Sequence, residues 1–364
     1  MQLSHSSKIL IAAVVLVIVA LSYYSFTTFT QNHSSLPTLT IYTYSSLFAD
    51  AQNVTQVNNT VFGGFERTYH VNLVVDRFSD TGSMLETLIQ QKADPRADIV
   101  VGLTNLQVTQ AVSHGVLLNY SPPNLGEVPK YLMNDLSPAH YLVPYEYSPI
   151  TLDYCNQSAG FGSNLSFTEL ATPSLAKQLV LENPTVDSTG ESFLLYEIAF
   201  YQEVLHENWE TWWKEVKPYA EVAPDWGTAF SIFPTDGHNL AVSYGGDPAY
   251  FKVFGGYPGC SSAAMHYGGE AYTWLEIEGM GIVRGAKHVK LAEDFENWLL
   301  SPQVQSLIPE GEWVFPADTA VPLPPVFSAA IGANNTVVLN NLITPEQIAA
   351  NLTVWLADWQ SIMS

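Results

Sequence analysis

The chain alternates strand-like and helix-like hydrophobic patterns from about residue 39 onward. Residues 39–44, 71–78 and 97–102 have the composition of strands, and the intervening segment places Met84, Leu85, Leu88 and Ile89 on one helical face. Regular alternation of strands and helices is typical of a parallel sheet covered by helices. The pattern therefore predicts an α/β fold.

The second half of the chain repeats this alternation without repeating the sequence. Strands are expected at 179–181 and 240–244, and helices at 192–205, 209–217 and 248–254. A chain of 364 residues is longer than one typical domain needs. We expect two α/β lobes, with strands at 141–145 and 150–154 leading into the second lobe and strands at 275–278 and 281–283 returning from it. The expected divisions are 1–37 (anchor and tether), 38–144 (first lobe), 145–275 (second lobe) and 276–364 (return to the first lobe and C-terminal helices).

Ligands of open α/β sheets bind beyond the carboxyl ends of the strands. Here those ends carry the loops 44–46, 80–82, 102–105, 188–190 and 244–247. Aromatic residues gather at these positions, among them Tyr44, Trp226 and Tyr250, and rings that face a cleft suit a flat or cationic ligand. Packing in the core is the alternative role for any one of these rings.

The N-terminus has the pattern of an export signal. A short basic head with His5 and Lys8 precedes the apolar run 9–21, and an amphipathic stretch extends it to Phe29. Two interpretations fit: a signal peptide that is removed, or an uncleaved signal anchor. We favour the anchor, because neither an A-x-A cleavage site nor a cysteine for lipid attachment follows. The protein is then expected at the cell surface, held in the plasma membrane.

Two further features suit an extracytoplasmic location. Asn-x-Ser/Thr sequons, which predict a glycoprotein, occur at Asn32, Asn53, Asn58, Asn119, Asn156, Asn164, Asn334 and Asn351. The two cysteines, Cys155 and Cys260, either pair in an oxidising compartment or remain buried thiols.

Charge and missing motifs narrow the function. Acidic residues outnumber basic ones by 35 to 13, which gives a formal charge of -22, so the protein repels nucleic acid and attracts cations. The excess of acid also suggests a surrounding medium of low pH. The sequence contains no H-E-x-x-H, P-loop or G-x-S-x-G motif, and its histidines lack zinc-site spacing. We therefore expect neither an enzyme nor a resident cofactor or metal.

After the tether, the chain resembles the thiamine-binding periplasmic proteins. The resemblance rests on an ordered set of short motifs: Leu39-Thr-Ile-Tyr-Thr-Tyr-Ser45, Ala97-Asp-Ile-Val-Val-Gly-Leu103, Pro144-Tyr-Glu-Tyr147, Ser188-Thr189, Trp226 within Trp-x-x-Ala-Phe, Ser243-Tyr244 with Pro248-Ala-Tyr250, and Gly311-Glu-Trp-Val-Phe-Pro316. It implies a type II periplasmic binding protein fold with a cleft between two lobes. It also implies a monomer that delivers thiamine, or a thiamine phosphate, to an ABC permease.

The resemblance also implies roles for single residues. Tyr44, Trp226 and Tyr250 would enclose the rings of thiamine. Its hydroxyethyl or phosphate end would be received by Asp80, Thr81, Ser188, Thr189 and Trp313. Tyr244 and Asp247 would complete the site. Thr81 and Ser188-Thr189 precede expected helices, whose free N–H groups favour an anion, although ordinary capping explains them equally.

The chain departs from the family pattern at Gly245, Gly246 and Asp247, where hydroxyl residues are usual, and Asp247 could face the thiazolium cation. A carrier of ferric iron or a polyamine on the same fold is the alternative, although ferric sites favour adjacent tyrosines that the second lobe lacks. An enzyme or a surface adhesin that shares the fold is a third possibility.

Overall fold

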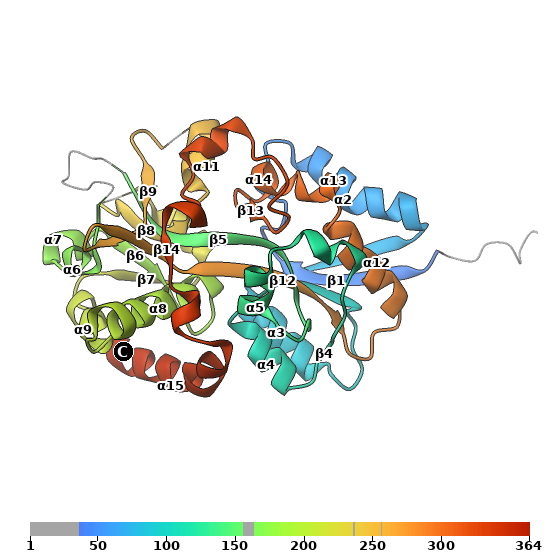
Figure 1. The fold of residues 1–364 in the computed structure, drawn as a ribbon, viewed down its shortest axis with the longest axis horizontal. Coiled ribbons are helices and arrows are strands. Elements are labelled where there is room, and N and C mark those ends of the chain that lie inside the picture. The colour runs from blue at the N-terminus through green and yellow to red at the C-terminus, as the bar shows by residue number, and fades with distance from the viewer. Residues whose placement is uncertain (1–35, 156–163, 236, 256) are drawn as a thin grey trace, which may run out of the picture.

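The computed structural model describes residues 36–155, 164–235, 237–255 and 257–364 (Figure 1). The expected anchor and the sequons at Asn32 and Asn156 lie outside these residues. Within the described ranges, no helix is long and apolar enough to cross a membrane.

The first lobe is built from the N-terminal third of the chain and a later return segment, which occupy the right side of Figure 1. Its elements are β1 (Thr38–Tyr44), α2 (Val54–Tyr69), β2 (Asn72–Phe78), α3 (Thr81–Gln90), β3 (Ile99–Thr104), α4 (Gln107–Ser113), β4 (Leu117–Leu118), α5 (Lys130–Leu136), the start of β5 (Val143–Tyr154), β12 (Leu275–Val283), α12 (Val289–Leu299), α13 (Pro302–Gln305), α14 (Ile308–Gly311) and β13 (Phe315–Pro316).

The second lobe, on the left side of Figure 1, contains most of the remaining elements. They are the end of β5, α6 (Phe167–Leu170), α7 (Pro173–Ala176), β6 (Leu179–Glu182), α8 (Ser188–Ala199) with a π-helical extension (Phe200–Leu205), α9 (Glu210–Val216), β7 (Glu221–Ala223), α10 (Trp226–Ile232), β8 (Leu240–Tyr244), α11 (Asp247–Phe254), β9 (Ser261–Ala263), β10 (Met265–Tyr267), β11 (Glu270–Thr273), β14 (Val337–Val338) and α15 (Pro345–Met363). The α/β fold predicted from the hydrophobic pattern is confirmed.

One long strand, β5, joins the two lobes. Its residues up to Pro149 pair with β12 in the first lobe, and its residues from Ile150 onward pair with β8 in the second. The strand order is β2-β1-β3-β12-β5-β8-β6-β7, so hydrogen bonding between strands continues from one lobe to the other. Where two short crossing strands were expected at 141–145 and 150–154, the structure has this single strand, which is buried along its whole length.

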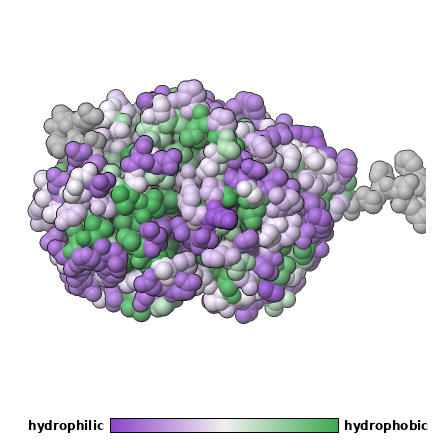
Figure 2. Space-filling view, viewed as in Figure 1, coloured by the Kyte–Doolittle hydropathy of each residue, from purple (hydrophilic) through white to green (hydrophobic). Residues whose placement is uncertain are grey.

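The buried hydrophobic residues form two main cores, one in each lobe. The first core includes Ile41, Val100 and Phe295, and the second includes Leu152, Phe193 and Trp212. Strand β3 is buried along its whole length, as expected for a parallel strand covered on both faces. Figure 2 shows hydrophobic residues gathered over part of the left lobe, while hydrophilic residues cover much of the rest of that face.

The C-terminal helix departs from the sequence-based expectation. Residues 345–363 were assigned to the first lobe, but α15 lies beside α9 in the second lobe (Figure 1). The ring of Trp359 packs against Trp213, with centroids 5.8 Å apart, and Lys217 Nζ donates to the Ile362 carbonyl. An amphipathic pattern predicts that a helix has a buried face but does not identify the surface that buries it.

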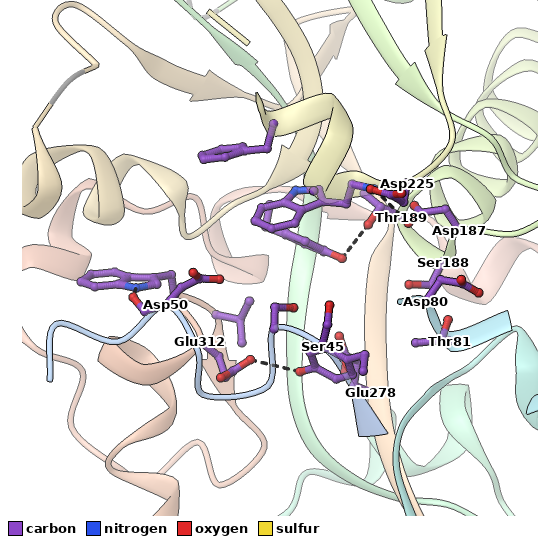
Figure 3. A pocket seen from close by; sticks show the side chains of 18 of the residues that line it. Ser45, Asp50, Asp80, Thr81, Asp187, Ser188, Thr189, Asp225, Glu278 and Glu312 are labelled. Atoms are coloured by element: carbon purple, nitrogen blue, oxygen red, sulfur yellow. Dashed lines mark hydrogen bonds between the residues drawn. The ribbon is translucent and has the colours of Figure 1, made fainter. Parts of the chain in front are cut away.

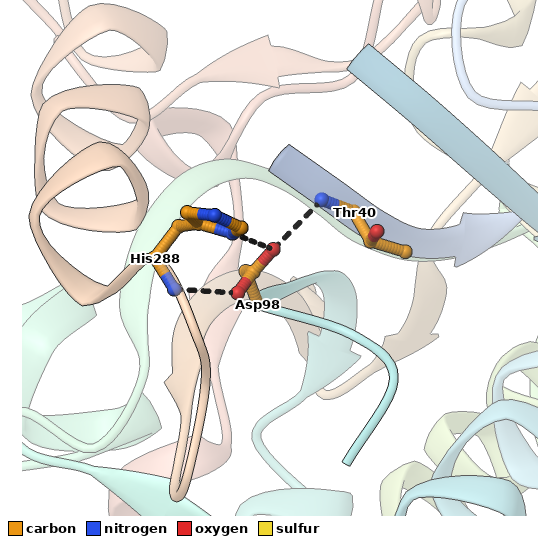
Figure 4. A network of polar contacts seen from close by, with 3 residues as sticks. All are labelled: Thr40, Asp98 and His288. Atoms are coloured by element: carbon orange, nitrogen blue, oxygen red, sulfur yellow. Dashed lines mark hydrogen bonds and ion pairs between the residues drawn. The ribbon is translucent and has the colours of Figure 1, made fainter. Parts of the chain in front are cut away.

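A buried aspartate fixes one end of the first-lobe sheet (Figure 4). Asp98 accepts hydrogen bonds from Thr40 N at 3.0 Å and from His288 N at 2.8 Å. The ring nitrogen Nδ1 of His288 lies 3.4 Å from Asp98 Oδ2. The carboxylate therefore ties β1 to the segment that precedes α12.

A disulfide joins Cys155, directly after β5, to Cys260, just before β9. The two cysteines close a loop of the second lobe, with a sequence separation of 105. We expect no reactive thiol in the purified protein when it is denatured without reductant, and two thiols per chain after reduction. Titration with a chromogenic thiol reagent measures both, and free thiol in the unreduced sample would contradict the pairing.

Candidate functional site

A cavity of about 620 Å³ lies between the two lobes at the carboxyl ends of the sheet strands (Figure 3). All ten residues that the sequence proposed for the site line it: Tyr44, Asp80, Thr81, Ser188, Thr189, Trp226, Tyr244, Asp247, Tyr250 and Trp313. Ser45 and Ser46, from the expected loop 44–46, line it as well, and the lining residues not proposed from the sequence are Asp50, Ser79, Glu146, Asp187, Asp225, Gly227, Phe230, Glu278, Gly311, Glu312 and Val314. The volume is typical of a site for one small molecule.

One wall of the cavity is aromatic and contains Trp226. This residue begins α10, and its ring stacks on Phe230 with centroids 4.9 Å apart. Trp226 Nε1 donates to Ser243 Oγ at 3.0 Å, and Ser243 in turn donates to Asp247. The indole is therefore held on both its face and its edge, which prepares a rigid surface for a flat ligand.

Asp247 lies in the cavity wall but is already hydrogen bonded. Its Oδ2 accepts from Ser243 Oγ and, at 3.1 Å, from Tyr244 N. Burial raises the pKa of this carboxyl, while its bond from Ser243 opposes the rise. Asp247 thus positions Trp226 through Ser243, a role that the sequence did not suggest when it placed this acid opposite a cation.

Tyr250 and Trp313 form a second aromatic group. Their rings meet edge to face with centroids 5.6 Å apart. Trp313 Nε1 donates to the Asp50 carbonyl at 3.0 Å, so its N–H is occupied. The resemblance implied that Trp313 receives the polar tail of the ligand, whereas here it offers only its ring. A Cβ on Gly246 would lie 1.6 Å from the Trp313 carbonyl oxygen, so only glycine fits there.

Tyr44 ends β1 with its hydroxyl in a group of buried acids. Its ring passes over Gly102, where a Cβ would lie 2.4 Å from the ring carbon Cδ1 and where φ is +107°. Glycine is therefore required at position 102 for both space and backbone conformation. Tyr42, two residues earlier on the same strand, does not line the cavity, and its hydroxyl donates to Gln91 Oε1 at 3.0 Å.

The polar end of the cavity lies where α3 and α8 begin, and Figure 3 shows Asp80, Thr81 and Ser188 together there. Asp80 caps α3 by accepting from Ser83 N at 2.6 Å. Asp187 caps α8 by accepting from Gly190 N at 3.0 Å, and its second oxygen accepts from Trp226 N at 3.0 Å. At each of these two helix starts, one backbone N–H that could hold an anion is thus engaged by the protein's own carboxylate.

Tyr244 links the polar end to a buried acid. Its hydroxyl lies 2.7 Å from Thr189 Oγ1 and donates to Glu276 Oε1 at 2.9 Å. The other oxygen of Glu276 accepts from Ser192 at 2.6 Å. Burial raises the pKa of Glu276 to about 7.

The acids on the floor of the cavity are the main feature that sequence reasoning missed. Glu146 and Glu278 lie on β5 and β12, directly opposite each other in the strand pairing, and Glu312 precedes β13. Burial, with the neighbouring carboxylates, raises the pKa of all three carboxyls well above the usual range. The sequence feature that could have revealed these acids is the presence of a glutamate inside an otherwise apolar strand. Within the described residues, no group of three or more His, Cys, Asp or Glu side chains has an arrangement that could hold a metal ion.

Comparison with known proteins agrees with this geometry. No protein-family model matches the chain. The thiamine-binding periplasmic protein of Brucella suis is 28% identical over 336 residues, which cover 90% of this chain and 92% of that protein. The protein of the same name from Escherichia coli K12 is 25% identical over 332 residues, which cover 90% of this chain and 94% of that protein. The resemblance to this family is confirmed.

Solved structures establish the fold. A periplasmic thiamin binding protein superposes with a TM-score of 0.78 at 24% identity, and the match covers 92% of this chain and 98% of that chain. This is the fold of a periplasmic binding protein. The ferric binding protein from Campylobacter jejuni shares the periplasmic binding protein fold with a TM-score of 0.70 at 16% identity, over 89% of this chain and 99% of that chain.

Proposed function

We propose that the protein is the extracytoplasmic solute-binding component of an ABC importer and that it captures thiamine in the cavity between its lobes. The observation that carries this proposal is the convergence of all ten expected residues on one cavity. Its rings at Trp226, Tyr250 and Tyr44 suit a flat heterocycle, and its excess of carboxyls suits a cation. Thiamine combines an aminopyrimidine ring with a cationic thiazolium ring.

The polar end of the cavity favours thiamine over its phosphates. Asp80, Asp187 and Asp225 all line this end, and each accepts a hydrogen bond from a backbone N–H at a helix start. Burial raises the pKa of Asp187 to about 6, so the group is largely ionised at neutral pH. A phosphate placed here would face three carboxylates, whereas a neutral hydroxyethyl group could donate to them.

A ligand panel tests the function and this order of preference together. Isothermal titration calorimetry at neutral pH should give the tightest binding for thiamine, with the diphosphate at least about tenfold weaker, which corresponds to about 1.4 kcal/mol. Spermidine and ferric iron are the competing ligands, because the fold is shared with iron-binding proteins and the cavity is acidic. Tighter binding of either competitor would overturn the proposal, and equal affinity for the diphosphate would overturn the preference.

We further propose that the chain is held at the cell surface by residues 9–29 and that it is glycosylated. The apolar run and the sequons support these assignments, and the sequons at Asn53, Asn119, Asn164 and Asn334 have exposed side chains. We expect the native protein to remain in the washed membrane fraction and to leave it only with detergent. Recovery in the soluble fraction of a form that begins near Thr38 would show that a peptidase removes the segment.

A further inference from the structure

The floor of the cavity contains a compact group of five side chains, Tyr44, Tyr145, Glu146, Glu278 and Glu312, which we call the carboxyl–tyrosine cluster. Tyr44 OH lies 3.0 Å from Tyr145 OH and 3.0 Å from Glu146 Oε1, and 3.1 Å from Glu312 Oε2. Tyr145 OH lies 2.7 Å from Glu278 Oε2. The cluster is thus one connected network of short oxygen–oxygen contacts.

These contacts need more hydrogens than the tyrosines supply. Each hydrogen bond uses one hydrogen, and the two phenols offer two for the four contacts. If Tyr145 donates to Glu278 and Tyr44 donates to Tyr145, then Glu146 and Glu312 can bond to the Tyr44 oxygen only as protonated acids. The geometry therefore calls for carboxylic hydrogens inside the cluster.

None of the ion pairs among the described residues includes the three acids of the cluster, so no basic side chain is paired with them there. The ionisable groups that face the cluster are two further acids, Asp50 and Glu276. Behind them, Glu276 is itself next to Asp187 and the phenol of Tyr244. Arg77, on β2, binds the loop beside Tyr44 but donates to backbone carbonyls. Two or three ionised carboxylates in so small a buried volume would repel one another strongly.

One buried atom of the cluster lacks a hydrogen-bond partner. Glu146 is 2% exposed and lines the cavity, and its Oε2 has no hydrogen-bond partner among the described residues. Tyr44, Glu278 and Glu312 line the cavity as well. Burial raises the pKa of both tyrosines well above the usual range, so the exchangeable protons belong to the carboxyls. A cation in the cavity would meet Glu278 and Glu312, which are half-buried, and reach Glu146 behind them.

We propose that the carboxyl–tyrosine cluster stores protons in the free protein and releases at least one of them to solvent when the cation of the bound ligand takes their place. This inference rests on the proposed function, because it takes the ligand to be a cation. The carboxylate left behind then faces the positive charge, so the complex gains an ion pair without an ionised acid having been buried alone. The cluster would thereby select cations over neutral molecules of the same shape.

Proton release makes the affinity depend on pH. The complex binds fewer protons than the free protein, so the affinity should rise as the pH rises, by about tenfold per pH unit for each proton released. Calorimetry with thiamine near neutral pH, in phosphate and in Tris, measures the release directly, because the buffers take up the proton with different enthalpies. We expect the observed enthalpy to differ between the buffers by an amount equivalent to at least half a proton.

Two variants locate the source of the protons. Glu146→Gln should reduce the number released and flatten the pH dependence of thiamine affinity. Glu296→Gln is the matched control, because Glu296 is equally buried on α12 but does not line the cavity. Thiamine binding with the same enthalpy in both buffers would overturn the inference and leave the proposed function intact.

A measurement on the free protein keeps the two proposals separable. Infrared spectroscopy should show a protonated-carboxyl band at neutral pH that loses intensity in Glu146→Gln or Glu312→Gln. An unchanged band in both variants would show that the cluster does not store protons, whichever ligand the protein binds. Failure of thiamine to bind in any buffer would overturn the proposed function and the release step with it, while the infrared result would still decide whether the cluster holds protons.

Discussion

Replacing Trp226 with alanine should weaken thiamine binding by about 3 kcal/mol, on the order of a hundredfold in Kd. The indole is fixed by stacking on Phe230 and by its hydrogen bond to Ser243, so it presents a large surface without having to be ordered on binding. Its loss removes both apolar contact and a cation–π interaction, each worth about 1 kcal/mol or more. Isothermal titration calorimetry of the purified variant at neutral pH measures the change.

The matched control is Trp355→Ala. Trp355 lies on α15, partly buried against the core of the second lobe, and does not line the cavity. This variant should lower the thermal stability without changing the affinity for thiamine. If Trp226→Ala keeps its circular dichroism spectrum and binds thiamine as tightly as the wild type, the site assignment is wrong even though the fold and family resemblance stand.

The free energy of unfolding should increase as the medium becomes more acidic, from about pH 8 to about pH 5. Burial, together with neighbouring carboxylates, raises the pKa of Glu191 to about 8 and that of Glu276 to about 7. An unfolded glutamate has a pKa of about 4.3. In this window the folded state holds more protons than the unfolded state, so stability is present at low pH and is lost as the pH rises through the folded-state values.

The size of this effect is large for a few side chains. Each such carboxyl contributes up to about 1.4 kcal/mol per pH unit, so two of them over about two pH units give up to about 6 kcal/mol. Urea unfolding followed by tryptophan fluorescence at several pH values measures the slope. Glu191→Gln should flatten it, whereas Glu207→Gln, which removes an exposed carboxylate, should not. Stability that falls steadily from pH 7 to pH 5 would contradict the argument and the suggested adaptation to an acidic medium.

The positions of the aromatic rings in the cavity show how much of the site the local sequence pattern can predict. Tyr44 ends a strand, Trp226 begins a helix that Asp225 caps, and Tyr250 lies on the helix that follows β8. Strand ends in an α/β sheet converge on one edge whatever the details of packing. Recognising the ends of β1 and β8 was therefore enough for Tyr44 and Tyr250, whereas β7, the strand before Trp226, was not predicted and the place of Trp226 rested on the family resemblance as well.

The acids of the carboxyl–tyrosine cluster, by contrast, could not be placed together from the local sequence pattern. Glu146 and Glu278 are far apart in the chain and meet only because β5 and β12 pair in antiparallel register. Glu312 joins them from the segment before β13, and its backbone partner is Phe48 N. A one-residue change of register would turn either strand acid to the other face of the sheet, so no local pattern could predict the meeting.

The sequence alone thus determined the alternation of strands and helices, the strand ends that form the cavity, and an excess of acid over base. These follow from periodicity and composition, which act over a few residues or over the whole chain. The tertiary structure decided that β5 runs unbroken between the lobes, that α15 packs on α9, and that three carboxyls share the cavity floor. Each of these depends on which distant segments pair, and that choice is made by the complementary shape of buried surfaces, which a local pattern does not encode.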